Sequence, residues 1–182
     1  GYGAACLAAL ESIVDSEEIL VFLQADCSED ANEAKALIEP ILRGEADLVI
    51  GSRVLGNALP GALRPHQRFG NWLATRLIYF FWGQRYTDLG PFRAIRAGTL
   101  RSLGMRERSY GWTVEMQVRA VQLGLRIVEV PVSSGLRLAG TDKVSGNFRA
   151  SVRAGHVILA TIFRLWLNKL NPVPSLSGKL RP

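Results

Sequence analysis

The sequence is poor in the residues that cross-link small proteins or bind metals. It has two cysteines, Cys6 and Cys27, among 182 residues, too few for a disulfide framework and without the spacing of a metal site. Both lie among apolar or small residues, so we expect buried thiols in a reducing compartment. The absence of low-complexity tracts and internal repeats excludes a solenoid or a disordered chain. No uncharged apolar stretch is as long as a membrane span, because the longest candidate, residues 154–167, carries His156 and Arg164.

The composition is that of one globular domain with a substantial core. Hydrophobic residues make up 48% of the chain and charged residues 21%, which are the proportions of a folded protein. The formal net charge of +6 favours an anionic partner: nucleic acid, a phosphorylated substrate or an anionic membrane surface. We rank nucleic acid last, because the sequence has no zinc-finger spacing, no RNA-binding aromatic motif and no helix-turn-helix signature.

The most informative stretch runs from an apolar segment into acidic residues. Residues 19–23 are apolar, Asp26 follows them, and a helical pattern begins at Ala31. This order predicts a buried strand with a carboxylate at its C-terminal end, where open α/β sheets bind ligands. A carboxylate there can hold a hard divalent cation, which in turn neutralises phosphate oxygens. The alternative is that Asp26 caps the next helix or lies in a solvated loop.

Hydrophobic periodicity predicts helices and strands along the whole chain. We expect helices over 3–12, 31–43, 67–82, 98–103, 113–123 and 146–170, and strands over 19–23, 47–50, 92–95, 126–130 and 132–136. The opening rhythm of helix, strand, helix, strand is typical of a mostly parallel, doubly wound sheet. Such a sheet usually begins with a strand whose loop meets the ligand, whereas this chain begins in the loop before a helix. We therefore expect a truncated domain that lacks its first strands.

Seven short motifs, taken in order, resemble those of glycosyltransferase family 2. They are the glycine-rich start at 1–5, the acidic stretch at 23–30, Gly-Ser-Arg at 51–53, Asp-Leu-Gly-Pro-Phe-Arg-Ala at 88–94, the segment 110–115 that leads to a glutamate, Glu-Val-Pro-Val at 129–132, and the basic loop at 137–146. The likeness is greatest to the dolichol-phosphate mannose synthase-like, or polyprenyl-phosphate glycosyltransferase, branch. It covers nearly the whole chain.

This resemblance implies a GT-A fold, an α/β doubly wound mixed sheet that here lacks its first strands. It divides the chain into a partial catalytic domain over 1–145, an amphipathic helix over 146–170 and a flexible tail over 171–182. The implied activity is a metal-assisted, inverting transfer of a hexose from a nucleotide-sugar donor to a polyprenyl phosphate. That reaction belongs to cell-wall or glycolipid synthesis at the cytoplasmic face of the membrane, and the implied cofactor is Mg²⁺ or Mn²⁺.

The implied metal ligands are Asp26 and Gln24. The family usually has Asp-x-Asp at this place, and Gln24 replaces the first acid. An amide oxygen can bind Mg²⁺ or Mn²⁺ but brings no charge, so the cation should bind more weakly. Glu29 and Asp30 could add negative charge, although we expect them to cap the following helix.

The remaining implied site residues are two acids and several cations. The substrate-binding residues are Ser52, Arg53, Arg93, Arg137 and Lys143, and the catalytic residues are Asp88 and Glu115. A guanidinium can bond two phosphate oxygens at once, whereas the alternative for Arg53 is a solvated loop arginine. Two cations on one loop, Arg137 and Lys143, could close over phosphates. Asp142 stands where the family usually has serine and partly cancels the charge of Lys143.

The two acids would act near the acceptor. A direct displacement needs a base or an oriented acceptor anion. An acceptor that is already a phosphate needs little deprotonation, so Asp88 and Glu115 would then only position it. The alternatives are an Asx-turn for Asp88 and an exposed helix position for Glu115.

The last predicted helix, 146–170, combines apolar residues and Trp166 with four basic side chains. This composition suits a helix that lies along a membrane surface, so we expect peripheral membrane contact, with residues 72–82 beside it. The alternative is that both helices pack on the sheet. For the whole chain, the competing hypothesis is an inactive fragment that acts as a membrane-associated interaction module.

Overall fold

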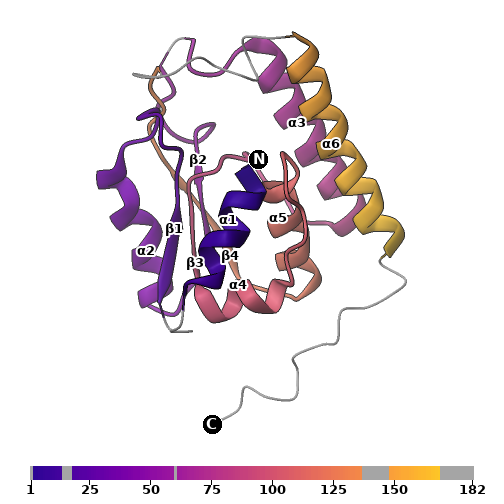
Figure 1. Ribbon diagram of the computed structural model, residues 1–182. Coiled ribbons are helices and arrows are strands. Elements are labelled where there is room, and N and C mark those ends of the chain that lie inside the picture. Colours follow the sequence, from indigo (N-terminus) through magenta and orange to yellow (C-terminus); the bar gives the residue numbers. More distant parts are fainter. Residues whose placement is uncertain (1, 14–17, 60, 137–147, 169–182) are drawn as a thin grey trace.

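The computed structural model describes residues 2–13, 18–59, 61–136 and 148–168. In chain order they form α1 (Tyr2–Glu11), β1 (Ile19–Phe22), the 3-10 helix η1 (Ala31–Glu33), α2 (Ala34–Leu42), β2 (Leu48–Ser52), α3 (Pro65–Trp82), β3 (Arg93–Arg96), α4 (Ala97–Leu103), α5 (Trp112–Gln122), β4 (Ile127–Pro131) and α6 (Phe148–Leu167). Figure 1 shows the sheet between α2 on one face and the other helices on the opposite face.

The four strands form one mixed sheet in the order β1-β3-β2-β4. β2 and β4 run parallel, with Val49 opposite Val128, whereas β3 runs antiparallel to both β1 and β2. The predicted mixed α/β sheet is therefore confirmed, but the expectation of a mostly parallel sheet is wrong. The reason lies in the connection: after α3, the segment 83–92 brings the chain back to the edge where β2 ends, so β3 starts there and runs against β2.

Strand β2 carries alternate side chains into two cores, as the period of two along a strand requires. Leu48 and Ile50 join the larger core with the helices of one face, and Val49 joins the smaller core with Leu37 and Ile41 of α2. All five residues of β2 are buried. Its position is therefore fixed from both faces, and the residues at its two ends are held with it.

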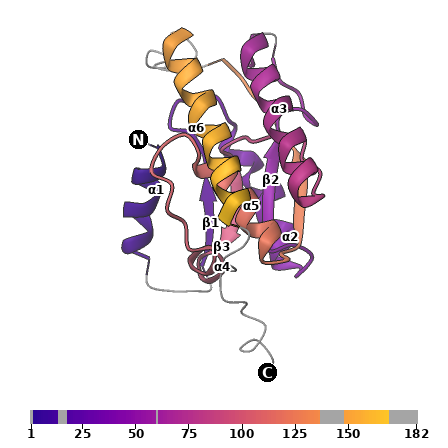
Figure 2. The ribbon, with the colours of Figure 1, turned by 90° about the vertical axis from the view of Figure 1, so that its right-hand side faces the viewer.

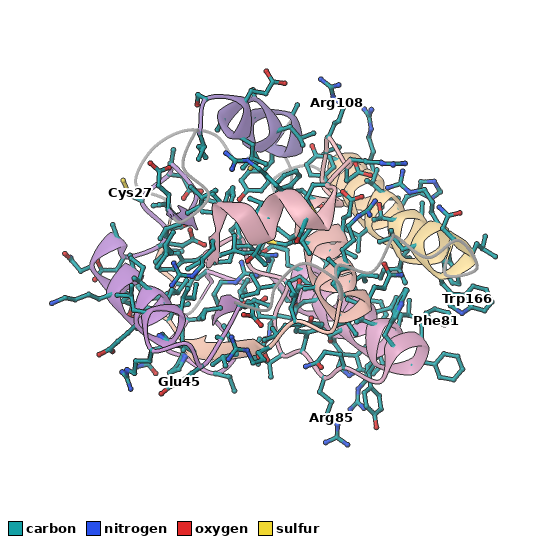
Figure 3. The ribbon with its side chains drawn as sticks, turned by 90° about the horizontal axis from the view of Figure 1, so that it is seen from below. Cys27, Glu45, Phe81, Arg85, Arg108 and Trp166 are labelled. Carbon is teal, nitrogen blue, oxygen red and sulfur yellow. The ribbon has the colours of Figure 1, made fainter. Side chains whose placement is uncertain are left out.

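Helices α3 and α6 lie side by side and parallel on the outside of the molecule (Figure 2). His66 and Ser151 approach at 3.4 Å near one end, and the rings of Phe81 and Trp166 stack with centroids 4.8 Å apart near the other. Figure 3 shows these two rings together at the edge of the molecule. Among the described helices, α6 alone is long and apolar enough to cross a membrane, a judgement of length and composition only.

Several expectations are corrected by the structure. Cys6 is buried as predicted, but Cys27 is exposed and projects from the surface (Figure 3). The strand expected at 19–23 is only half-buried, because β1 lies at the edge of the sheet. The strand expected at 132–136 is absent apart from one bridge between Ala58 and Ser134. The predicted tail at 171–182 lies outside the described residues.

Candidate functional site

Four segments meet at the edge of the sheet where β1, β2 and β4 end and β3 begins. The segment after β4 binds two others: Gly135 N–H donates to the carbonyl of Ser28, at 2.8 Å, and Ser134 N–H donates to that of Asn57, at 3.2 Å. The segments that follow β2 and precede β3 meet through Arg53 and Asp88. Because strand ends of open α/β sheets are where ligands bind, this convergence defines the candidate site.

Arg53 and Asp88 form a bidentate ion pair at this edge. Nε of Arg53 donates to Oδ2 of Asp88 at 2.7 Å, and Nη2 donates to Oδ1 at 2.8 Å. The backbone N–H of Arg53 also donates to Oδ2, at 2.9 Å. Because the Asp88 side chain is 1% exposed and that of Arg53 is 21% exposed, neither the Asx-turn nor the solvated loop arginine describes them.

The electrostatics of the pair favour the charged form of Arg53. Burial disfavours the charged guanidinium, but the hydrogen bonds and charge of Asp88, with the charge of Glu29, outweigh it and raise the pKa of Arg53. Gly90 lies close beside the pair: a Cβ at this position would lie 3.2 Å from Oδ2 of Asp88 and 3.3 Å from Nε of Arg53, so a larger residue would require these groups to shift. The glycine in the motif therefore keeps the pair free of crowding.

Ser52 and Arg93 support the site from inside the protein. Ser52 is fully buried, and its hydroxyl lies 2.6 Å from that of Thr87. Arg93 is also fully buried; it donates to the carbonyls of Thr113 and Leu89, at 3.0 and 3.4 Å, and to that of Gly90. Burial lowers the pKa of Arg93 below its ordinary value. Both side chains hold the backbone of the site, and neither is exposed to a ligand in this structure.

Glu115 is a buried anchor for a neighbouring loop. Its Oε2 accepts hydrogen bonds from the backbone N–H groups of Arg106 and Glu107, at 2.9 and 2.6 Å, and its Oε1 pairs with Arg119. Glu115 is fully buried, so the alternative of an exposed helix position is wrong. The structure does not join Glu115 to Arg53 or Asp88 through any hydrogen bond of the described residues.

The acidic loop after β1 offers few metal ligands. Oδ1 of Asp26 accepts hydrogen bonds from the N–H and hydroxyl of Ser28, at 3.0 and 2.6 Å. Asp30 caps η1 as expected, by accepting from the N–H of Asn32. Glu29 is not a cap: it is 7% exposed and accepts from the N–H of Gln24, at 2.8 Å.

Two features bear on whether this loop fits a cation. Burial raises the pKa of Glu29, and the charge of Asp26 raises it further, while the N–H of Gln24 and the charge of Arg53 oppose these effects. No group of three or more His, Cys, Asp or Glu side chains that could hold a metal occurs among the described residues. Asp26, Glu29 and Gln24 therefore offer at most a partial set of oxygen ligands, which suits Mg²⁺ held mainly by substrate phosphates and water.

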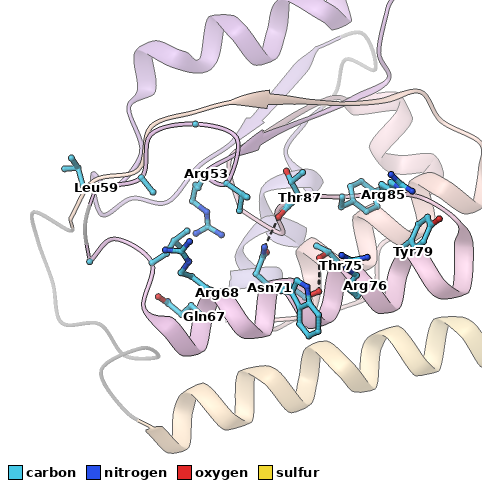
Figure 4. Close-up of a pocket in the computed structure, with 17 residues that line it drawn as sticks. Arg53, Leu59, Gln67, Arg68, Asn71, Thr75, Arg76, Tyr79, Arg85 and Thr87 are labelled. Atoms are coloured by element: carbon cyan, nitrogen blue, oxygen red, sulfur yellow. Dashed lines mark hydrogen bonds between the residues drawn. The ribbon is translucent and has the colours of Figure 1, made fainter.

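A groove of about 1050 Å³ opens beside the ion pair, between α3 and the segment that follows β2. Figure 4 shows Arg53 and Arg68 at one end and Arg76, Tyr79 and Arg85 at the other. Apolar side chains also line the groove, including Leu59, Leu63 and Trp72. The groove thus combines guanidinium groups with apolar walls.

Sequence reasoning missed several residues of the site. Asn71, Gln117 and Glu129 bind the backbone around Asp88, and Arg68 lines the groove. Glu129 could have been singled out from the sequence, because it is a lone acid in an otherwise apolar strand. Asn71, Gln117 and Arg68 could not, because polar side chains are common on any helix. Arg137 and Lys143 lie outside the described residues.

No protein-family model matches the chain. It is 36% identical over 157 residues to an uncharacterized glycosyltransferase of Mycobacterium tuberculosis, and the match covers 85% of this chain and 68% of that protein. It is 34% identical over 142 residues to the undecaprenyl-phosphate mannosyltransferase of Micrococcus luteus, covering 71% and 54% of the two chains. It is 29% identical over 161 residues to the polyprenol monophosphomannose synthase of Mycolicibacterium smegmatis, covering 81% and 57%.

The names of these relatives agree with the family that the motifs along the sequence resemble. The chain belongs to glycosyltransferase family 2, in its polyprenyl-phosphate glycosyltransferase branch.

Proposed function

We propose that this chain transfers a hexose, with mannose as the first candidate, from a nucleotide-sugar to a polyprenyl phosphate. The observation that carries the proposal is the bidentate Arg53–Asp88 pair at one end of a groove with arginines and apolar walls. A polyprenyl phosphate has the same two parts, an anionic head and an apolar chain. The names of the relatives in Micrococcus and Mycolicibacterium support this choice of acceptor and sugar.

Arg53 binds the acceptor phosphate in this proposal. Asp88 occupies its Nε and Nη2, and Nη1 has no hydrogen bond among the contacts of the described residues. A guanidinium fixed by one carboxylate presents its remaining donors in a set direction, which favours a phosphate placed there. Asp88 is then not a base: its oxygens hold Arg53, and the acceptor phosphate is already an anion at neutral pH.

The reaction is a direct displacement in this account. An oxygen of the acceptor phosphate attacks the anomeric carbon of the donor sugar, and the nucleoside diphosphate leaves from the opposite face, which inverts the configuration. The groove brings the two reactants together and excludes water from the attacking oxygen. Mg²⁺ or Mn²⁺ bound by Asp26, Gln24 and Glu29 would neutralise charge on the leaving diphosphate.

Membrane contact through α3 and α6 completes the proposal, with the site at the cytoplasmic surface. Large apolar side chains are exposed on both helices: Phe80 is 79% exposed, Trp72 52% and Trp166 41%. Ile162 and Leu165 of α6 are buried among neighbouring helices, so only part of this helix faces outward. A helix with one buried and one exposed apolar face suits the surface of a bilayer, where the acceptor resides.

A transfer assay tests the proposal. The protein is incubated with vesicles that contain undecaprenyl phosphate, with GDP-mannose or UDP-glucose and with Mn²⁺, and glycosylated lipid is detected by mass spectrometry. We expect transfer by the natural protein, its loss in Arg53→Ala, and its retention in the matched control Arg126→Ala, which breaks a second Arg–Asp pair at the other end of β2.

Three other outcomes would contradict parts of the proposal. Equal transfer by Arg53→Ala would remove Arg53 from acceptor binding. Binding to the vesicles without transfer from either donor would favour a non-catalytic, membrane-associated module. Chelation of Mn²⁺ with no loss of transfer would remove the cation from the mechanism and leave the acceptor site unaffected.

A further inference from the structure

The segment Thr87–Leu89 carries Asp88, and its backbone is bound almost entirely by side chains. It belongs to no helix or strand. Each of its three N–H groups and three carbonyl groups has a side-chain hydrogen-bond partner. Backbone groups usually find backbone partners, so a segment held in this way has had its position set by distant parts of the chain.

Four side chains from four elements supply these bonds. Glu129 of β4 accepts from the N–H groups of Thr87 and Asp88, at 2.9 to 3.2 Å. Gln117 of α5 donates to the carbonyl of Asp88 at 3.0 Å, and Arg93 of β3 donates to that of Leu89 at 3.4 Å. The fourth side chain is Asn71 of α3.

Asn71 makes two bonds that flank Asp88. Its Nδ2 donates to the carbonyl of Thr87 at 2.9 Å, and its Oδ1 accepts from the N–H of Leu89 at 2.8 Å. An amide can do both, whereas a carboxylate cannot donate and an alkyl group can do neither. Asn71 also lines the groove (Figure 4). It therefore joins the wall of the groove directly to the backbone on both sides of Asp88.

We propose that Asn71 is a positioning residue that sets the direction of the Arg53 guanidinium by fixing the Thr87–Leu89 segment. This inference rests on the proposed role of Arg53 in binding the acceptor phosphate. Asp88 accepts three hydrogen bonds from Arg53, so a shift of the Asp88 backbone is transmitted to the guanidinium. Asn71 touches no reacting atom in this account; it acts through Asp88.

Two isosteric variants separate the two bonds of Asn71. Asn71→Leu removes both bonds, and Asn71→Asp keeps an acceptor for Leu89 but loses the donor to Thr87. The matched control is Thr161→Val on α6: Thr161 is 2% exposed, lies outside the groove and donates to the carbonyl of Val157 at 2.8 Å. The control therefore also removes a buried hydrogen bond, but none at the site.

The first measurement needs no ligand. Hydrogen exchange of the Arg53 Nε–H, followed by NMR, reports its bond to Asp88. We expect exchange to accelerate about tenfold in Asn71→Leu, which loses two hydrogen bonds, and about threefold in Asn71→Asp, which loses one. Thr161→Val should leave it unchanged while lowering the melting temperature. Acceleration in Thr161→Val as large as that in Asn71→Leu, or none in either Asn71 variant, would overturn the proposal.

The second measurement uses geranyl phosphate as a soluble acceptor probe. Its Kd should rise in the same order, Asn71→Leu above Asn71→Asp above Thr161→Val, and in the transfer assay KM for the acceptor should rise more than kcat falls. If the natural protein does not bind geranyl phosphate, the proposed function fails, whereas the exchange of Arg53 still decides the role of Asn71. If Asn71→Leu does not fold, Asn71→Asp gives both readouts.

Discussion

The two ends of β2 carry the same Arg–Asp arrangement. Arg53 follows the strand and binds Asp88, while Asp47 precedes the strand and binds Arg126. In both pairs Nε and one Nη of the arginine bond the two carboxylate oxygens, at 2.7 to 3.0 Å. In both, the backbone N–H of the arginine also donates to the carboxylate. The arginine–carboxylate hydrogen bonds alone therefore do not distinguish the candidate site from its counterpart, although Nη1 of Arg126 also donates to the carbonyl of Gly44.

The surroundings of the two pairs differ. The side chains of Arg126 and Asp47 are 57% and 28% exposed, against 21% and 1% for Arg53 and Asp88. Asp88 also lies in a segment bound by distant side chains, and Arg53 lines the groove. The exposed pair joins the starts of two adjacent parallel strands, β2 and β4. Burial and the neighbouring groove therefore distinguish the pair that the proposed function uses from the same ion pair at the other end of β2, which connects two strands.

The largest predicted difference between the pairs concerns stability. Asp88→Asn leaves Arg53 with its charge uncompensated in a largely buried position, which should lower the free energy of unfolding by about 3 kcal/mol. Asp47→Asn should lower it far less, because water solvates both partners when the exposed pair is broken. Urea denaturation of the two variants measures both effects. Equal losses would show that burial does not separate the pairs.

The next largest effect concerns ligand binding. Lysine keeps the positive charge of arginine but loses its planar, bidentate donors. Arg53→Lys should therefore weaken binding of geranyl phosphate about tenfold, the scale of one good charge-assisted hydrogen bond. Arg126→Lys should not change it. Isothermal titration of both variants gives the comparison, and an equal loss in Arg126→Lys would mean that the overall charge, not the groove, binds the phosphate.

The sequence singles out both members of the buried pair but gives no sign of their pairing. The motifs predict Arg53 and Asp88 as separate site residues, one to bind substrate phosphate and one as a catalytic acid near the acceptor. They are 35 residues apart, and they meet because β3 inserts antiparallel between β1 and β2. The expected mostly parallel sheet does not contain that insertion, so it gives no reason to bring the two side chains together.

Residues that hold backbone groups were the hardest to interpret from sequence. Glu115 was expected near the acceptor or on an exposed helix face, yet it is buried and binds two N–H groups of a loop. Glu29 was expected to cap a helix, but its carboxylate instead accepts a hydrogen bond from the N–H of Gln24. A carboxylate that accepts from a distant backbone has the same local sequence as one that faces water, and only the tertiary arrangement separates them. Asp30, whose partner is two residues away, was predicted correctly.

A third prediction examines the support beneath the buried pair. The carboxylate of Glu129 accepts from the N–H groups of Thr87 and Asp88, and the exposed pair has no comparable side-chain support in the hydrogen bonds of the described residues. Glu129→Gln keeps one oxygen acceptor but places an amide donor against the N–H of Thr87, so it should lower the free energy of unfolding by about 1 kcal/mol. It should also accelerate exchange of the Arg53 Nε–H without affecting that of Arg126. Equal acceleration at both arginines would indicate general loosening of the protein.

The smallest predicted effect is the pH dependence of the exposed pair. The hydrogen bonds of Arg126 lower the pKa of Asp47 below its ordinary value, against the opposing effect of partial burial. A carboxyl group whose pKa is lower in the folded state adds stability above its unfolded pKa, near 3.9, and loses this contribution as the pH falls through the folded value. The stability difference between the natural protein and Asp47→Asn should therefore be constant from pH 7 to about pH 5 and should shrink below about pH 4.

Urea midpoints of both proteins at pH 7, 5 and 3 measure this difference. At pH 7, high salt should also reduce it, because the pair is exposed to solvent. If the difference stays unchanged at pH 3, the asparagine acts through packing. The exposed pair would then contribute no electrostatic stability, and the comparison with the buried pair would fail.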